Sequence, residues 1–246
     1  MRFFRRRAPC SRAVDRSPQR RELLRLAGAS GAALLGLAGP SRAAEQRDPA
    51  GPAPTAVEDL IHAQGLLERV LLVYEESARR LAGADEPVPP EVVRDAAQIV
   101  RGYVEDHHQK LEEKHVFPRF ERAAAQEHAD LVRVLREQHE AGRRLTDRIL
   151  KLAGTKLDDP VARNQLQASL RDAVRMLRPH ESREDTVLFP AFRRRVGAAE
   201  YRALGEEMRS AEARAPAGGL EMMVEKVSAL ERQLGLYDLS RFTPKA

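Results

Sequence analysis

Cysteine and tryptophan are nearly absent from this sequence of 246 residues: Cys10 is the single cysteine, and there is no tryptophan. Because Cys10 lies in a basic segment at the start, the rest of the chain can form no disulfide bond and no thiolate metal site. Aromatic residues make up only 4%, and no stretch shows the alternation typical of a β-strand. Charged residues make up 32%, and abundant Ala, Leu, Glu and Arg favour long helices. Any metal would therefore be bound by histidine and carboxylate side chains.

The positive charge is concentrated in one segment. The chain has a formal net charge of +5, but residues 1–43 contain ten arginines against Asp15 and Glu22. Beyond residue 43 there are 32 basic and 35 acidic residues, a net charge of −3. The basic character gives no argument for a nucleic-acid partner, and we expect none.

Residues 1–43 resemble a signal peptide of the twin-arginine type. Arg20 and Arg21 precede an apolar stretch, and Ser41 and Ala43 supply small residues at the −3 and −1 positions of a cleavage site. The stretch from Leu26 to Gly39 is shorter than the roughly 20 apolar residues of a membrane span, so we expect no stable span. A disordered basic tail is the alternative. The order of the three features favours export of the folded protein to the periplasm.

Four long helices are predicted after a linker at residues 44–55. Thr55 and Glu58 form a possible capping box at the start of the first helix. Apolar periodicity places the helices at about residues 56–81, 90–117, 126–152 and 160–188, with shorter helices at 198–213 and 220–234. Phe117-Pro118 is expected to bend or end the second helix, and Phe189-Pro190 to close the fourth. The sequence thus predicts an all-α fold: an up-down-up-down four-helix bundle over 56–192 with a C-terminal helical extension over 193–246.

One motif occurs twice in this bundle. His-x3-Glu-x4-Phe-Pro starts at His108 and again at His180, 72 residues later. The helix before each copy carries a single histidine with a glycine three residues on. The side chains predicted to bind metal are His62, His108, Glu112, His139, His180 and Glu184.

The spacing of the motif suits a metal site. Residues four apart lie on one face of a helix, so each His-Glu pair can reach one ion. Burying two glutamates without cations would cost several kcal/mol each, whereas two carboxylates can bridge adjacent ions. Glu113 and Asp185 lie about 100° further round their helices and are expected to be solvated or to stand behind the ligands. A lone core histidine or a hydrogen-bonded His-Glu pair would be ordinary, but the repeated set predicts a two-metal site in the bundle core.

At these residues the sequence resembles the hemerythrin-like family, specifically the HHE cation-binding domains. The resemblance covers roughly residues 56–192, and the tail ending near Pro244 is similar to extensions in that family. It implies a centre of two non-haem iron ions with oxo or hydroxo and carboxylate bridges, and reversible oxygen binding as the reference activity. Oxygen carriers have a further histidine one turn from the ligand on the third helix, where this chain has Leu135 and Arg143. Six protein ligands for two metals would leave more coordination positions open.

Three functions follow from this interpretation. The first is a di-iron binding protein that handles O2, NO or iron in an exported compartment. The second is a di-iron redox enzyme that consumes O2, peroxide or NO, with a redox partner that the sequence does not identify. The third is a purely structural bundle. The sequence has no substrate-pocket motif and no four-cysteine iron site for electron transfer, which favours binding over catalysis.

Overall fold

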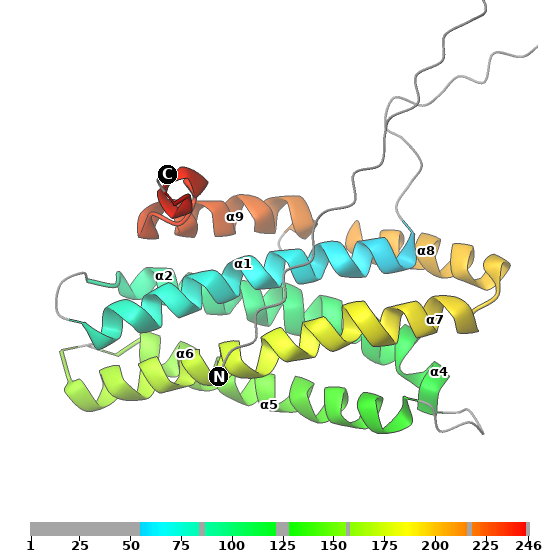
Figure 1. The fold of residues 1–246 in the computed structure, drawn as a ribbon, viewed down its shortest axis with the longest axis horizontal. Coiled ribbons are helices and arrows are strands. Elements are labelled where there is room, and N and C mark those ends of the chain that lie inside the picture. Colours follow the sequence, from blue (N-terminus) through cyan, green and yellow to red (C-terminus); the bar gives the residue numbers. More distant parts are fainter. Residues whose placement is uncertain (1–54, 84–86, 122–127, 156–157, 216–217, 245–246) are drawn as a thin grey trace, which may run out of the picture. The chain divides into compact units, whose positions relative to one another are not determined.

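The computed structural model describes residues 55–244 except for gaps at 84–86, 122–127, 156–157 and 216–217. The predicted signal peptide and nearly all of the linker lie outside the described residues. Every regular element in the described part is a helix, which confirms the all-α prediction (Figure 1). None of these helices is long and apolar enough to cross a membrane.

The first helix, α1 (Ala56–Ala82), begins where the capping box predicts. The Thr55 hydroxyl accepts a hydrogen bond from the Glu58 amide, and the Glu58 carboxylate accepts one from the Thr55 amide at 2.7 Å. Both contacts satisfy amides that lack a partner at the start of a helix.

We call each of the four long helical regions of the bundle an arm, and α1 is the first. The second arm, from Pro90 to Glu121, is a series of helical segments in which π-helical turns interrupt the α-helix. It contains α2 (Pro90–Ile99), the π-helix η1 (Val100–His108), α3 (Gln109–Leu111), the π-helix η2 (Glu112–Val116) and α4 (Pro118–Glu121). The Phe-Pro pair does not end this arm, because helix resumes at Pro118 and continues to Glu121.

The fourth arm begins at Pro160 as predicted, whereas the described part of the third arm begins at Ala129, three residues after the predicted start. The third arm is α5 (Ala129–Ala153), and the fourth is α6 (Pro160–Arg183), followed by the π-helix η3 (Glu184–Leu188) and by α7 (Phe189–Arg195). The prediction that Phe189-Pro190 closes the fourth helix is wrong, since α7 runs on to Arg195. Pro190 is the second residue of α7 and directly follows the π-helix η3, so the helix continues through it.

The long helices pack as a bundle, and the extension packs on it. Helix α6 lies against α1 and α5, and α2 lies against α5 and α1 (Figure 1). Helix α8 (Ala198–Glu212) packs on α1, while α9 (Gly219–Leu234) packs on α1 and α2. A short 3-10 helix, η5 (Leu239–Phe242), follows.

Two apolar clusters divide the core of the bundle. The larger cluster contains Leu67, Val70, Val100, Ile149 and Leu170, and the smaller one contains Leu60, Phe117, Leu135, Phe189 and Phe192. All four arms contribute to both clusters. Along each arm, buried polar residues lie between the residues of the larger cluster and those of the smaller one. A polar layer therefore crosses the bundle between the two clusters.

Candidate metal centre

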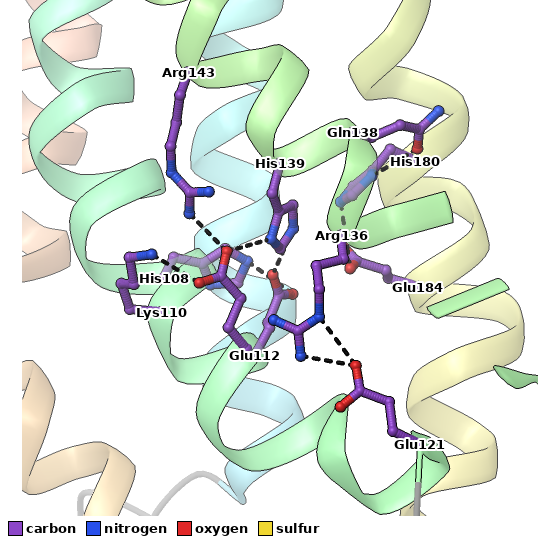
Figure 2. Close-up of polar contacts among 11 residues, drawn as sticks. His108, Lys110, Glu112, Glu121, Arg136, Gln138, His139, Arg143, His180 and Glu184 are labelled. Carbon is purple, nitrogen blue, oxygen red and sulfur yellow. Dashed lines mark hydrogen bonds and ion pairs between the residues drawn. The ribbon is translucent and has the colours of Figure 1, made fainter. Parts of the chain in front are cut away.

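Five of the six predicted ligands meet in this polar layer. His108 ends η1, Glu112 begins η2, His139 lies on α5, His180 lies on α6 and Glu184 begins η3 (Figure 2). Their exposed fractions are 4%, 0%, 0%, 4% and 1%, respectively. The structure therefore brings histidines and carboxylates from three arms into one buried group.

The distances within this group are short. His108 Nε2 lies 3.2 Å from Glu112 Oε1, and His180 Nε2 lies 3.3 Å from Glu184 Oε1. The third histidine contacts the first pair, because His139 Nε2 is 3.5 Å from Glu112 Oε2. His139, His180 and Glu184 each offer one ligand atom, and these three atoms lie within 4.8 Å of one another.

The prediction for His62 is corrected by the structure. The His62 side chain is exposed, and Gln64 occupies the buried face of α1 instead, with only 3% of its surface exposed. Gln64 Nε2 donates a hydrogen bond to Glu184 Oε2 at 2.7 Å. Residues two apart on a helix point about 200° from each other, so only one of the two can face the core. The signal for Gln64 was its position between the buried Leu60 and Leu67, four and three residues away.

Several polar atoms of the group have no hydrogen-bond partner among the described residues. They are both carboxylate oxygens of Glu112, Oε1 of Glu184, Nε2 of His139, Nδ1 of His108 and Oε1 of Gln64. A buried polar atom without a partner costs about 1–3 kcal/mol, and more when it is charged. A bound cation would satisfy these oxygens and nitrogens together, so the donor set fits a metal ion.

Burial and mutual charge perturb the ionisation of the group. Burial raises the pKa of Glu184 well above its ordinary value, and the neighbouring Glu112 carboxylate adds to the rise. Burial would also raise the pKa of Glu112, but the nearby histidines, led by His108, outweigh it and lower that pKa. Burial lowers the pKa of His139, and it lowers the pKa of His180 to about 4. These two imidazoles are thus neutral near pH 7, as a metal ligand must be.

In two of the histidines, the Nδ1 atom contacts a side chain that the sequence did not single out as a ligand. Gln138 Oε1 lies 2.9 Å from His180 Nδ1 (Figure 2), which leaves Nε2 of that ring to face the layer. Glu113 Oε1 lies 3.0 Å from His139 Nδ1. Such contacts fix the tautomer and orientation of a metal-binding imidazole. The sequence signal for Glu113 was limited to its place next to Glu112, because the contact with His139 crosses between helices.

The repeated Phe-Pro pair shapes the backbone around both glutamates. Glu112 and Glu184 each begin a π-helical turn, and the amide of the phenylalanine five residues later donates to each glutamate carbonyl. A proline one residue further on cannot make the α-helical hydrogen bond, and its ring would clash with the carbonyl four residues before it. The wider π-turn accommodates the proline without ending the helix, a feature common at functional sites.

His107 and His115 lie outside the group, although both are buried. His107 Nε2 lies 2.8 Å from Glu212 Oε2 at the end of α8, and His115 Nε2 lies 3.6 Å from Glu207 on the same helix. Of the adjacent pair His107 and His108, only His108, which belongs to the repeated motif, therefore lies in the buried group.

Comparison with known proteins agrees with this arrangement. The family model of the hemerythrin HHE cation-binding domain matches residues 55–156 and, in a second overlapping match, residues 130–241. Similar proteins, all described as uncharacterised, come from Mycobacterium bovis and from two strains of Mycobacterium tuberculosis. Each is 45% identical over 193 residues, covering 77% of this chain and 74% of its own length. No solved structure gives a significant match.

Proposed function

Since the chain belongs to the hemerythrin HHE cation-binding family, we propose that it binds two non-haem iron ions in the buried polar layer. The observation that carries the proposal is the set of buried histidine and glutamate atoms that lack hydrogen-bond partners in the described part of the chain. Imidazole and carboxylate ligands suit iron, and Glu112 and Glu184 are the side chains proposed to bridge the two ions. Bound iron would supply a Lewis acid and a redox-active centre, with an oxo or hydroxo bridge completing the site.

The size of the ligand follows from the burial of the group. No proposed ligand side chain is more than 4% exposed, so a large substrate could not touch these residues unless the helices moved apart. A diatomic molecule such as O2 or NO, or an iron ion itself, is small enough. We therefore favour a binding protein that handles one of these species over an enzyme with an organic substrate.

A redox enzyme that consumes O2, peroxide or NO remains the second candidate. The same buried group would serve it, because these substrates are equally small. Turnover of peroxide or NO by the iron-loaded protein with a supplied electron donor distinguishes the two: sustained consumption supports the enzyme, and binding without consumption supports the binding protein.

Metal analysis after anaerobic loading with iron(II) tests the proposal. The full chain should hold about two iron ions at saturation, and His139→Ala and Glu184→Gln should each lose metal. His62→Ala is the matched control, because this histidine is exposed on α1 and should not affect binding. A chain that binds almost no iron, or equal loss of iron in His62→Ala, would contradict the proposed site.

Export to the periplasm by the twin-arginine route is part of the same proposal. Its support is the order of Arg20-Arg21, the apolar stretch and the Ser41/Ala43 cleavage site, and these residues lie outside the described part of the structure. Replacing both arginines with lysine should leave precursor in the cytoplasm. Normal export of that double variant would exclude this route.

A further inference from the structure

We infer that a pocket between the end of α1 and the C-terminal segment binds an anion that carries two or more phosphate groups. The pocket has a volume of about 550 Å³, which is within the range of small-molecule sites. Its charged lining side chains are Glu76, Arg79, Arg80, Arg232 and Arg241. None of the side chains proposed to bind metal lines it, so the inference does not depend on the proposed function.

The fold gathers these arginines from three separate elements. Arg79 and Arg80 lie in the last turn of α1. Arg232 lies in the last turn of α9, and Arg241 lies in η5, beside the end of α9 (Figure 1). Four positive charges against the one negative charge of Glu76 give the pocket a net charge of +3. Charge of one sign around a hollow attracts a ligand of the opposite sign.

The capping of helix ends explains only part of this arrangement. Arg80 Nη2 donates a hydrogen bond to the Leu234 carbonyl at 2.6 Å, and Arg241 Nη1 donates one to the Gly235 carbonyl at 2.9 Å. Cations at the end of a helix stabilise it in this way. Each contact uses one of the several N–H donors of a guanidinium group, so the same side chain can cap a helix and bind an anion.

Two of the four guanidinium groups, those of Arg232 and Arg241, have no acidic partner within ion-pair distance in the described part of the chain. Arg232 lies over the Tyr237 ring, with its Cζ atom 4.0 Å from the ring centroid. The Arg241 side chain bonds only the Gly235 carbonyl. These two groups therefore carry positive charge that a bound phosphate would neutralise.

Gly235 allows Arg241 to lie close to the turn that ends α9. The φ angle of Gly235 is 72°, a left-handed conformation that favours glycine, and a Cβ atom at this position would collide with Arg241 Nη1. The guanidinium group is thus placed against the backbone before any ligand arrives. A side chain that is ordered in advance loses little freedom on binding, which favours affinity.

Charge and shape indicate the chemistry of the ligand. The planar guanidinium group binds phosphate oxygens in pairs. One phosphate group carries a charge of about −1.5 to −2 near pH 7, so a net charge of +3 matches two of them. Phe242 also lines the pocket and is 59% exposed, so it offers an aromatic face on which a nucleobase can stack. A nucleoside diphosphate and free pyrophosphate share this chemistry, and the experiment distinguishes them.

Calorimetric titration of the full chain with adenosine diphosphate, pyrophosphate and orthophosphate tests the inference. Pyrophosphate should bind more tightly than orthophosphate, and added salt should weaken it. Arg232→Gln and Arg241→Gln should each lower the affinity for pyrophosphate about tenfold or more, because each removes charge-assisted hydrogen bonds. Arg133→Gln is the matched control, since Arg133 lies on α5, pairs with Glu137 and does not line the pocket.

The adenosine diphosphate titration identifies the source of the phosphate groups. Tighter binding than pyrophosphate, reduced to the pyrophosphate affinity in Phe242→Ala, identifies a nucleotide, and equal affinity identifies free pyrophosphate. Failure of the wild type to bind either probe would overturn the inference. So would orthophosphate that binds as tightly as pyrophosphate, or equal affinities in Arg133→Gln and both pocket variants. If Arg232→Gln loses helical content by circular dichroism, Arg241→Gln decides the question, because Arg241 is exposed in a short segment outside the long helices.

Discussion

Replacement of Glu113 by glutamine tests whether metal affinity depends on the negative charge of a carboxylate that contacts the ligand His139. Glu113 Oε1 accepts hydrogen bonds from His139 Nδ1 at 3.0 Å and from Arg143 Nη2 at 2.7 Å, and Lys110 Nζ lies 2.7 Å from Oε2. Burial would raise the pKa of Glu113, but hydrogen bonds from these three side chains lower it well below its ordinary value. The carboxylate is thus ionised behind His139, whose other ring nitrogen faces the layer.

The expected loss of metal affinity follows from the hydrogen bond that glutamine keeps and the negative charge that it removes. Its oxygen can still accept the His139 hydrogen bond, but the negative charge that makes the imidazole a better donor is gone. Removing such partners costs about 10–100-fold in metal affinity, equivalent to about 1.4–2.8 kcal/mol. We expect Glu113→Gln near the lower value and Glu113→Ala near the upper, because alanine also removes the hydrogen bond.

Competition between the protein and a chromophoric chelator for iron(II) measures this loss. Glu121→Gln is the matched control: its carboxylate pairs with Arg136 at 2.9 Å, is 41% exposed and touches no ligand. An exposed pair of this kind contributes at most about 1 kcal/mol to folding and should contribute nothing to binding. Nitrogen NMR of metal-free protein gives a second measurement, since only Glu113 variants should change the His139 tautomer. Equal affinities for Glu113→Gln and Glu121→Gln would refute the reasoning.

Two further predictions concern stability. Thr55→Ala removes the capping box of α1 and should cost about 1 kcal/mol, lowering Tm by about 2–4 °C in thermal circular dichroism; an unchanged Tm would mean that α1 is held by packing alone. Glu212→Ala removes the carboxylate that His107, Tyr103 and the Leu220 amide contact, so urea unfolding should show a loss of about 1–3 kcal/mol. Iron stoichiometry should stay the same in this variant, and its loss would show that α8 supports the metal site.

The parts of the fold that local chemistry determines were predictable from the sequence. The start of α1 depends on two residues three apart, Thr55 and Glu58, and the structure contains both contacts. His108 and Glu112 had to share a face because they are four apart, and the same holds for His180 and Glu184. Each pair constrains its own register, so the repeat predicted which face of the helix both pairs occupy, and the structure buries all four side chains in one group.

The histidine of α1 was misplaced because no second residue constrained it. Ile61 is apolar but 40% exposed, and counting it as part of the buried stripe turns the expected face of the helix toward His62. The buried stripe contains Leu60, Gln64 and Leu67. A polar residue such as glutamine carries no apolar signal, so periodicity alone could not show that it faces the core.

The continuation of both Phe-Pro helices was not predictable for a different reason. Proline removes a hydrogen bond and normally ends or kinks a helix, which is the rule that the sequence prediction applied. A π-turn relieves the same constraint by moving the hydrogen bond to the residue five back, as Phe117 does with the Glu112 carbonyl at 3.0 Å. Local sequence does not distinguish the two responses, because both are compatible with a proline at this position.

The internal repeat matches the two His-Glu pairs but not the side chains that contact the histidines, and this difference predicts which histidine depends more on its neighbour. His139 is backed by the Glu113 carboxylate, whereas His180 is backed by the neutral amide of Gln138. A carboxylate raises the donor strength of an imidazole more than an amide does. His139 therefore gains more donor strength from Glu113 than His180 gains from Gln138. Glu113→Ala should weaken iron(II) binding more than Gln138→Ala does in the same chelator competition, because only the first variant removes a negative charge as well as a hydrogen bond. Equal losses of affinity in the two variants would show that the charge of the carboxylate beside His139 does not contribute to metal binding.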